Sequence, residues 1–132
     1  MKATDLMIGD KVMVKVLSQI PNTYVLHTWT ANDYSMDIQV KPIPLTPEIL
    51  EKNGFERGVL IPSKFYRNIN NERLMFCPHS SCYDLGYVHW NESNDVDIMH
   101  RLEVQQPIMY IHQMQHALRL FGLDELADNF KV

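Results

Sequence analysis

Alternating apolar and polar positions predict short strands in the first forty-odd residues. After the turn signal Gly9-Asp10, valine takes every second position from 12 to 16, the period of two expected of a half-buried strand. A second β-rich run covers residues 24–29, and a third alternating run covers 36–40. Three short strands joined by tight turns suit a small SH3-like barrel or a meander, and the pattern does not choose between these two folds.

The next segment predicts a stiff connector followed by a short helix. Residues 42–45 contain two prolines, each of which restricts its own φ angle and that of the preceding residue. Thr46 can cap a helix, Pro47 suits its first position, and Gly54 can provide a left-handed stop. We therefore predict a two-turn helix over residues 47–53. Its inward-facing residues are expected to be Ile49 and Leu50.

The middle of the chain, from residue 58 to residue 104, is again rich in β-forming residues. Polar turns separate the apolar runs, so a mainly antiparallel sheet is expected. The candidate strands are residues 59–61, 74–77, 85–90 and 98–104.

The C-terminal pattern predicts an amphipathic helix over residues 107–121, ended by Gly122. At 100° per residue, its apolar side chains fall within an arc of about 120°. The polar side chains lie on the other side, and the two histidines among them are expected to face water or a partner. The apolar arc contains Tyr110, Ile111, Met114, Ala117, Leu118 and Phe121, and the polar side contains His112, Gln115, His116 and Arg119.

Together these elements predict an α+β fold. It has an N-terminal SH3-like three-strand β unit, a short linking helix, a mainly antiparallel sheet and a C-terminal amphipathic helix. A chain of 132 residues, 45% of them hydrophobic, is the size of one domain with a true core. We expect a single domain over 1–132, with sub-lobes at 1–45 and 46–132.

The charge balance argues against a nucleic-acid partner. The formal net charge is −4, and no stretch concentrates lysine and arginine as duplex-binding proteins usually do. A mild basic excess between Lys52 and Arg73 is diluted by glutamates, although a local patch can still form in three dimensions.

The N-terminal residues and the cysteine count favour a cytoplasmic protein with no membrane partner. Two acidic residues and a glycine within the first ten positions do not fit the apolar core of a signal peptide. No apolar run approaches the roughly 20 residues that span a bilayer. The two cysteines, Cys77 and Cys82, are too few for a disulfide framework and are expected to be reduced.

Residues 112–116 read His-Gln-Met-Gln-His, close to the His-Glu-x-x-His motif of zinc metalloproteases. His112 and His116 lie one helical turn apart and could both reach a zinc ion. The protease motif needs a glutamate as general base, and Gln113 cannot act as one. Arg119 would place a positive charge beside the metal, and no third histidine follows. We interpret both histidines as exposed polar residues, and we assign no catalytic residue.

Cys77, His79, Cys82 and His89 place four potential metal ligands within a short span. A structural zinc knuckle normally has two residues between its cysteines, whereas this pair has four. If the flanking strands pair as a hairpin, His89 could come close to Cys77. We favour a turn with incidental thiols, and we assign no metal and no other cofactor.

Aromatic residues provide one further candidate site. Trp29, Trp90 and the six tyrosines could form a platform on which a nucleotide or a single strand stacks. In a chain with this apolar content, such residues more often belong to the core or to sheet faces. The sequence contains no glycine-rich phosphate loop and no nucleophile elbow.

Residues 41–55 and 110–122, together with the phrase Asp-Leu-Met-Ile-Gly-Asp-Lys-Val at 5–12, resemble a family of small uncharacterised proteins. Gut bacteria, their prophages and related phages encode that family. The resemblance implies the same layout and a mobile-element origin, and it implies no activity. Some relatives carry glutamate at the position of Gln113, whereas others carry asparagine in place of the second histidine, which would be unusual for a zinc ligand.

We therefore expect a non-enzymatic binding or interaction protein with a protein partner, of the kind that phages or mobile elements carry as accessories. One alternative is a zinc-dependent hydrolase acting through His112 and His116. Another is a protein that sequesters a small molecule such as a nucleotide.

Overall fold

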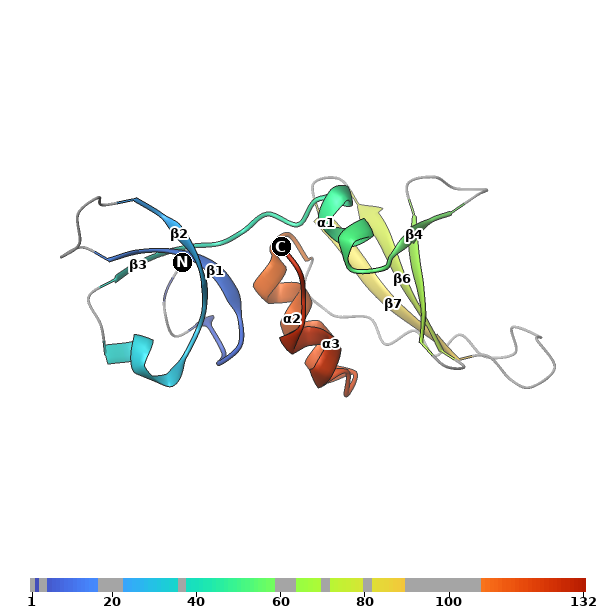
Figure 1. The fold of residues 1–132 in the computed structure, drawn as a ribbon. Helices are drawn as coiled ribbons and strands as arrows, with labels where there is room; N and C mark the ends of the chain where they lie inside the picture. The colour runs from blue at the N-terminus through green and yellow to red at the C-terminus, as the bar shows by residue number, and fades with distance from the viewer. Residues whose placement is uncertain are drawn as a thin grey trace. The chain divides into compact units, whose positions relative to one another are not determined.

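The computed structural model describes residues 2, 5–16, 23–35, 38–58, 64–69, 72–79, 82–89 and 108–132. It confirms an α+β chain with two small antiparallel sheets and few helices (Figure 1). The expected strands at 59–61 and 98–104 lie outside the described residues. The elements are β1 (Lys11–Val16), β2 (Val25–Thr28), the 3-10 helix η2 (Ala31–Ser35), β3 (Ile38–Lys41), α1 (Pro47–Lys52), β4 (Glu56–Arg57), β5 (Phe65–Ile69), β6 (Glu72–His79), β7 (Cys82–His89), α2 (Ile111–Leu120) and α3 (Asp124–Asp128).

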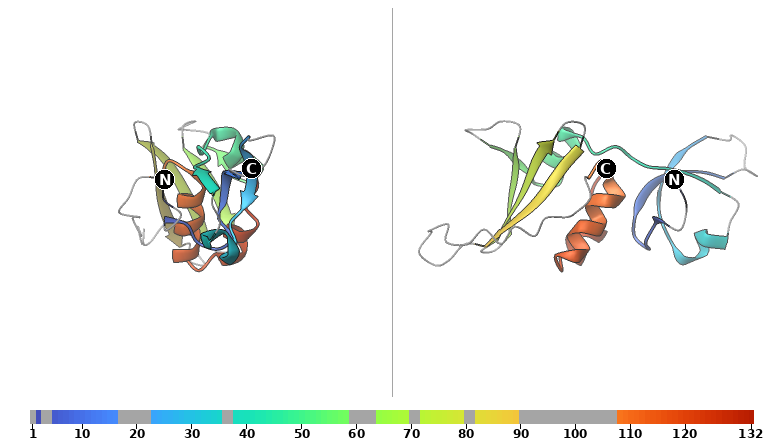
Figure 2. Two further views of the ribbon diagram at one scale, coloured as in Figure 1. Left: turned by 90° about the vertical axis from the view of Figure 1, so that its left-hand side faces the viewer. Right: turned by 180° about the vertical axis from the view of Figure 1, so that it is seen from behind.

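The chain forms two compact units. The first unit consists of Met1–Leu45 and Tyr110–Val132, and the second consists of Thr46–Met109. The first unit therefore combines both ends of the chain, which the two colour extremes of Figure 2 make easy to follow. The expected sub-lobe 46–132 would group the C-terminal helix with the middle of the chain. The helix belongs with the N-terminal strands instead.

The sheet of the first unit has the strand order β2-β1-β3, with β1 antiparallel to both neighbours. A simple meander would place β2 in the centre, so the meander interpretation is wrong. The predicted alternation in β1 is confirmed, because Val12 and Val14 are buried in the core. The core cluster comprises Leu6, Val12, Val14 and Trp29, with Ile38 and Val40 packed against it.

Trp29 is fully buried, so it cannot belong to an exposed stacking platform. Its ring makes an edge-on contact with Tyr34, with 5.5 Å between the ring centroids. The Tyr34 hydroxyl donates a hydrogen bond to the Leu6 carbonyl at 2.6 Å, which closes one side of the core. Trp90, the other tryptophan of the proposed platform, lies outside the described residues.

The second unit has a four-stranded antiparallel sheet in the order β4-β5-β6-β7. One face of this sheet is buried, because Phe65, Leu74 and Phe76 are at most 2% exposed. Phe55, the residue directly after the turn that ends α1, makes an edge-on contact with Phe76, with 6.2 Å between the ring centroids. The expected strand at 74–77 falls within β6, and the expected strand at 85–90 overlaps β7.

Helix α1 forms as its local sequence predicts. The Thr46 hydroxyl accepts a hydrogen bond from the Ile49 N–H at 3.3 Å, and Pro47 occupies the first turn. At the other end, Gly54 has φ of +81°, and the Phe55 N–H donates to the Leu50 carbonyl at 3.1 Å. This is the Schellman arrangement, which satisfies carbonyl groups that the end of a helix leaves open.

Within the residues that the structure describes, no helix combines the length and the apolar character needed to cross a bilayer.

Two glycines with positive φ provide a matched stability test. Gly54→Ala is expected to lower the free energy of unfolding by about 1–2 kcal/mol, because a side chain disfavours the left-handed conformation. An added Cβ would also lie 3.1 Å from Arg67 Nη1. Gly122→Ala carries the backbone cost alone, since φ is +77° and no atom of the described residues is found within 4 Å of the added Cβ. Urea unfolding followed by circular dichroism should show the larger loss for Gly54→Ala, and equal losses would contradict the crowding at Arg67.

Candidate functional site

A buried carboxylate connects the two ends of the first unit. Asp10 lies in the turn before β1, and its side chain is fully buried. His116 Nε2 lies 2.6 Å from Asp10 Oδ2, and Arg119 Nη1 donates to Asp10 Oδ1 at 2.7 Å. The Met7 N–H donates to the same carboxylate at 2.8 Å. The polar side of α2 therefore docks on the turn at Asp10.

Gln115 makes the second connection between α2 and this turn. Its side chain is fully buried, and its Oε1 accepts a hydrogen bond from the Lys11 N–H at 2.8 Å. Its Nε2 donates to the Gly9 carbonyl at 3.0 Å and to the Ala127 carbonyl at 2.9 Å. One amide thus satisfies backbone groups from the turn and from α3, which would otherwise be costly to bury.

Gly9 allows α2 to approach this closely. Its φ is +95°, and its N–H donates to the Trp29 carbonyl at 2.8 Å. A Cβ at this position would lie 3.0 Å from Arg119 Nη2 and 3.1 Å from Asp128 Oδ1. The backbone conformation therefore favours glycine here, and an added side chain would also displace the ends of the Arg119 and Asp128 side chains.

The expectation that the histidines of the C-terminal helix are exposed is wrong for His112, and Gln115 on the same polar side is buried as well. Gln115 is fully buried, and His112 is only 6% exposed. The His112 ring stacks on Tyr110 with 6.0 Å between centroids, and it meets the His116 ring edge-on at 5.7 Å. The physical reason is that the turn at residues 9–11 offers a carboxylate and backbone groups that match the polar side of the helix. Helical periodicity alone cannot reveal such a partner.

The side chains of the histidine motif have partners within the first unit. His116 Nε2 is engaged by Asp10, and the Gln113 side chain accepts a hydrogen bond from the Tyr110 N–H at 3.1 Å, at the start of α2. Within the described ranges, no three His, Cys, Asp or Glu residues are grouped so that they could hold a metal ion. His112 Nδ1 is buried and has no hydrogen-bond partner among the described residues.

Two pKa shifts follow from this packing. Burial acts to raise the pKa of Asp10, but the hydrogen bonds from His116, the Met7 N–H and Arg119 outweigh it. The pKa of Asp10 therefore lies below its ordinary value of 3.8. Burial lowers the pKa of His112 below 6.5, and the charge of His116 lowers it further. The folded protein thus favours an ionised Asp10 and a neutral His112.

The register of β6 and β7 separates the cysteines and histidines that the sequence places within a short span. β6 and β7 pair so that His79 lies opposite Cys82, Cys77 opposite Asp84, and His89 opposite Glu72. His89 is thus five residues along the strand from the partner of Cys77, about 17 Å away at the usual rise per residue. The hypothesis that His89 approaches Cys77 in a hairpin is therefore wrong. The side chains of these four candidates lie outside the described part of the structure.

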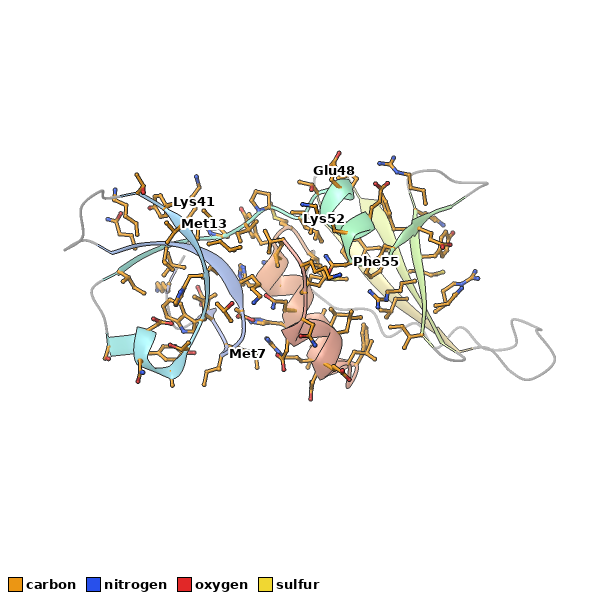
Figure 3. All side chains as sticks on the ribbon, viewed as in Figure 1. Met7, Met13, Lys41, Glu48, Lys52 and Phe55 are labelled. Atoms are coloured by element: carbon orange, nitrogen blue, oxygen red, sulfur yellow. The ribbon has the colours of Figure 1, made fainter. Side chains whose placement is uncertain are left out.

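The outer face of the sheet in the first unit collects lysines. The register places alternate residues of the three strands on the face away from Val12 and Val14. Figure 3 labels two neighbours on this face, Met13 and Lys41, which are paired across β1 and β3. None of the three strands contains an acidic residue. This lysine face consists of Lys11, Met13, Lys15, Tyr24, Leu26, Thr28, Gln39 and Lys41.

Two lysines of this face contact the Tyr24 ring, and the third contacts Thr28 of β2. The ammonium groups of Lys15 and Lys41 lie 5.6 Å and 5.7 Å from the ring centroid of Tyr24. Lys11 Nζ donates to Thr28 Oγ1 at 2.5 Å. Tyr24 is 38% exposed and Leu26 is 53% exposed, so the face offers apolar contact area between its charges.

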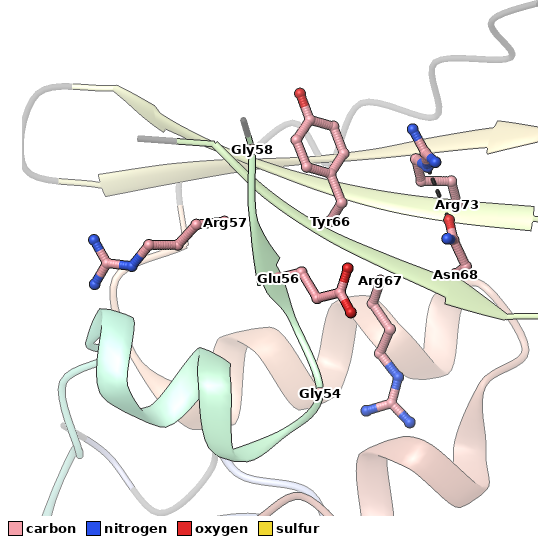
Figure 4. Close-up of a pocket in the computed structure, with 8 residues that line it drawn as sticks. All are labelled: Gly54, Glu56, Arg57, Gly58, Tyr66, Arg67, Asn68 and Arg73. Atoms are coloured by element: carbon pink, nitrogen blue, oxygen red, sulfur yellow. Dashed lines mark hydrogen bonds between the residues drawn. The ribbon is translucent and has the colours of Figure 1, made fainter. Parts of the chain in front are cut away.

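A basic hollow of about 440 Å³ lies on the second unit and is lined by Arg57, Arg67, Arg73, Tyr66, Asn68 and Glu56, with Gly54 and Gly58. Figure 4 shows that the three guanidinium groups point in different directions. Arg67 donates to the Asn53 carbonyl, Arg73 donates to Asn68 at 2.8 Å, and Arg57 donates to Glu51 at 2.7 Å. The basic excess noted between residues 52 and 73 thus gathers around one hollow, but its cations do not converge on a common point.

Sequence reasoning missed the lysine face and the role of Asp10. The sequence indicates only that Asp10 belongs to a turn, because its side-chain partners lie 106 and 109 positions away in the chain. A signal for the face was present: Lys11, Met13 and Lys15 share a parity in β1 opposite to that of the buried valines. The positions of Tyr24 and Lys41 beside them depend on strand pairing.

No protein-family model matches the chain, and no curated protein or solved structure matches it with significance.

The buried carboxylate gives the first prediction for this region. Asp10→Asn should lower the free energy of unfolding by about 3 kcal/mol, because it removes the charge that Arg119 and His116 are packed against. Asp128→Asn is the control, since Asp128 meets the other side of Arg119 at 3.3 Å but is 59% exposed. It should cost less than about 1 kcal/mol. Similar losses in urea unfolding for both variants would show that the buried contact does not hold α2 in place.

Stability should also fall on mild acidification because of His112. A group whose pKa is lowered on folding stabilises the fold fully above its unfolded pKa, and this contribution is lost as the pH falls below that value. For His112 the loss begins near pH 6.5, whereas for Asp10 it begins near 3.8. The charged and titratable groups that act on His112 are His116, Asp10, Asp5 and the N-terminus.

His112→Phe keeps a ring to stack on Tyr110 and cannot take up a proton. The variant should therefore lose less unfolding free energy than the wild type when the pH is lowered from 7.5 to 5.5. Urea unfolding at the two pH values measures this difference. Equal losses in the two proteins would show that His112 is not the group responsible.

Proposed function

We propose that this protein is a non-enzymatic interaction protein that binds an acidic surface of a protein partner through its lysine face. The observation that carries the proposal is the grouping of Lys11, Lys15 and Lys41 around Tyr24, on strands that contain no acidic residue. The chain as a whole has a formal net charge of −4, so these cations gather against the overall balance.

The chemistry of the face suits protein recognition. Complementary charge speeds association and selects among partners, while exposed aromatic and aliphatic side chains supply the contact area that holds a complex together. Tyr24 and Leu26 provide such contacts, and the lysines surround them. Because the ammonium groups already lean over neighbouring side chains, less side-chain freedom is lost on binding.

An acidic protein fits this face better than a nucleic acid. The negative net charge of the chain would repel a polyanion at long range, whereas discrete carboxylates on a protein can meet individual lysines. Tyr24 is the aromatic residue of the lysine face, and single-strand binders stack successive bases on several rings. A protein partner is therefore the favoured class.

The groups that resemble a catalytic motif support a non-enzymatic role. His116 and Gln115 are occupied by Asp10 and by backbone groups, so they stabilise the first unit. As part of the proposal, the first unit acts as a small SH3-like module in the cytosol, in the accessory role that the resemblance to phage and gut-bacterial proteins implies.

Affinity capture from a gut-bacterial lysate tests the proposal. The wild type, Lys15→Glu/Lys41→Glu and Lys52→Glu/Lys64→Glu would be immobilised at equal density. The two double variants change the net charge equally, but the second pair lies in the second unit. We expect the wild type and the second variant to capture the same acidic protein, and the first variant to lose it. Capture that is equal for all three proteins, or absent for all three, would contradict the proposal.

A further inference from the structure

Among the residues that the structure describes, strand β2 is paired along one backbone edge only. It lies at the end of its sheet, and among the described residues it pairs only with β1. Val25 is 54% exposed and Leu26 is 53% exposed, although they point to opposite faces of the sheet. An exposed apolar edge strand is a template for another strand, and β2 itself contains no proline or charged residue of the kind that usually blocks such pairing.

The backbone groups at this edge can be assigned. The Trp29 N–H donates to the Asp10 carbonyl, and the Trp29 carbonyl accepts from the Gly9 N–H, each at 2.8 Å. Both polar groups of Trp29 therefore point toward the β1 side. Because these groups alternate along a strand, those of Leu26 and Thr28 point toward the open edge.

Two lysine ammonium groups lie near the two ends of β2. The Lys11 ammonium reaches Thr28 Oγ1, and the Lys15 ammonium lies over the Tyr24 ring. Thr28 and Tyr24 are four residues apart on the same face, about 13 Å along an extended strand. Leu26 lies between them and presents an exposed apolar side chain.

We propose that β2 accepts an extended acidic segment of the partner protein as an additional strand. The segment carries two carboxylates four residues apart, which meet Lys11 and Lys15, and an apolar side chain midway that packs on Leu26. Its backbone pairs with the outward N–H and C=O groups of Leu26 and Thr28. This inference rests on the proposed function and names the recognition mode of that surface.

A second copy of the chain is a poor occupant of the same edge. Antiparallel pairing of two β2 strands would bring the Lys11 end of one copy beside the Lys15 end of the other. Like charges opposite each other across strands destabilise pairing. The lysines of β1 that reach toward β2 thus oppose self-association and favour an acidic strand.

A synthetic peptide tests the pairing directly. A fluorescein-labelled peptide with the core Glu-Thr-Val-Thr-Glu would be titrated with the full-length protein at 50 mM salt and followed by fluorescence polarisation. The control peptide replaces both glutamates with lysine. We expect saturable binding of the acidic peptide that weakens as salt is added, and no binding of the control peptide.

Three variants separate charge from backbone pairing. Lys15→Glu should weaken binding of the acidic peptide by about tenfold or more. Leu26→Pro removes an outward N–H and is tolerable at an edge position, so it should abolish binding while the fold persists. Leu26→Ala removes the side chain but keeps the N–H, and it should weaken binding less than Leu26→Pro. Circular dichroism and thermal melting would confirm that all three variants are folded.

The possible outcomes distinguish this inference from the proposed function. If the peptide fails to bind while lysate capture still depends on Lys15 and Lys41, strand addition is wrong and the proposed function stands. If a folded Leu26→Pro binds as well as Leu26→Ala while Lys15→Glu does not bind, backbone pairing is again overturned. Tighter, Lys15-dependent binding of a labelled oligothymidine would overturn both and point to nucleic acid.

Discussion

The pairing of Asp10 with His116 and Arg119 is the interaction on which the first unit depends. A fully buried carboxylate is costly unless charges and hydrogen bonds compensate for the lost water. Here the compensating groups come from α2, more than a hundred positions later in the chain. Gln115 adds bonds to Gly9 and Lys11, so the helix docks on a turn at one place and in one register. Both ends of the chain thereby become parts of one unit.

This arrangement determines what the histidine motif can do. The spacing of His112 and His116 brings their rings together, but their partners are Tyr110, Asp10 and each other. The resemblance to a metalloprotease helix reflects the i, i+4 geometry that any two residues one turn apart share. In this protein the same geometry places an imidazole against a buried carboxylate, and the helix serves the fold.

The two faces of the sheet formed by β2, β1 and β3 differ in polarity. Whereas the core side is filled by Val12, Val14 and Trp29, the outer face carries cations around an exposed tyrosine and leucine. Under the proposed function, the lysines of β1 that reach toward β2 would oppose pairing between identical copies and favour a partner segment that carries carboxylates.

The sequence by itself determined the elements whose causes are local. The alternation of valines in β1 and the stop signals of α1 were predicted correctly, because neighbouring residues set strand faces and helix ends. Tertiary structure decided the rest. Gln115 became buried because the turn at residues 9–11 bonds to it, and Lys11, Lys15, Tyr24 and Lys41 became one face because β1 pairs with two strands. Contacts between distant positions depend on register and docking, for which a single sequence carries no local signal.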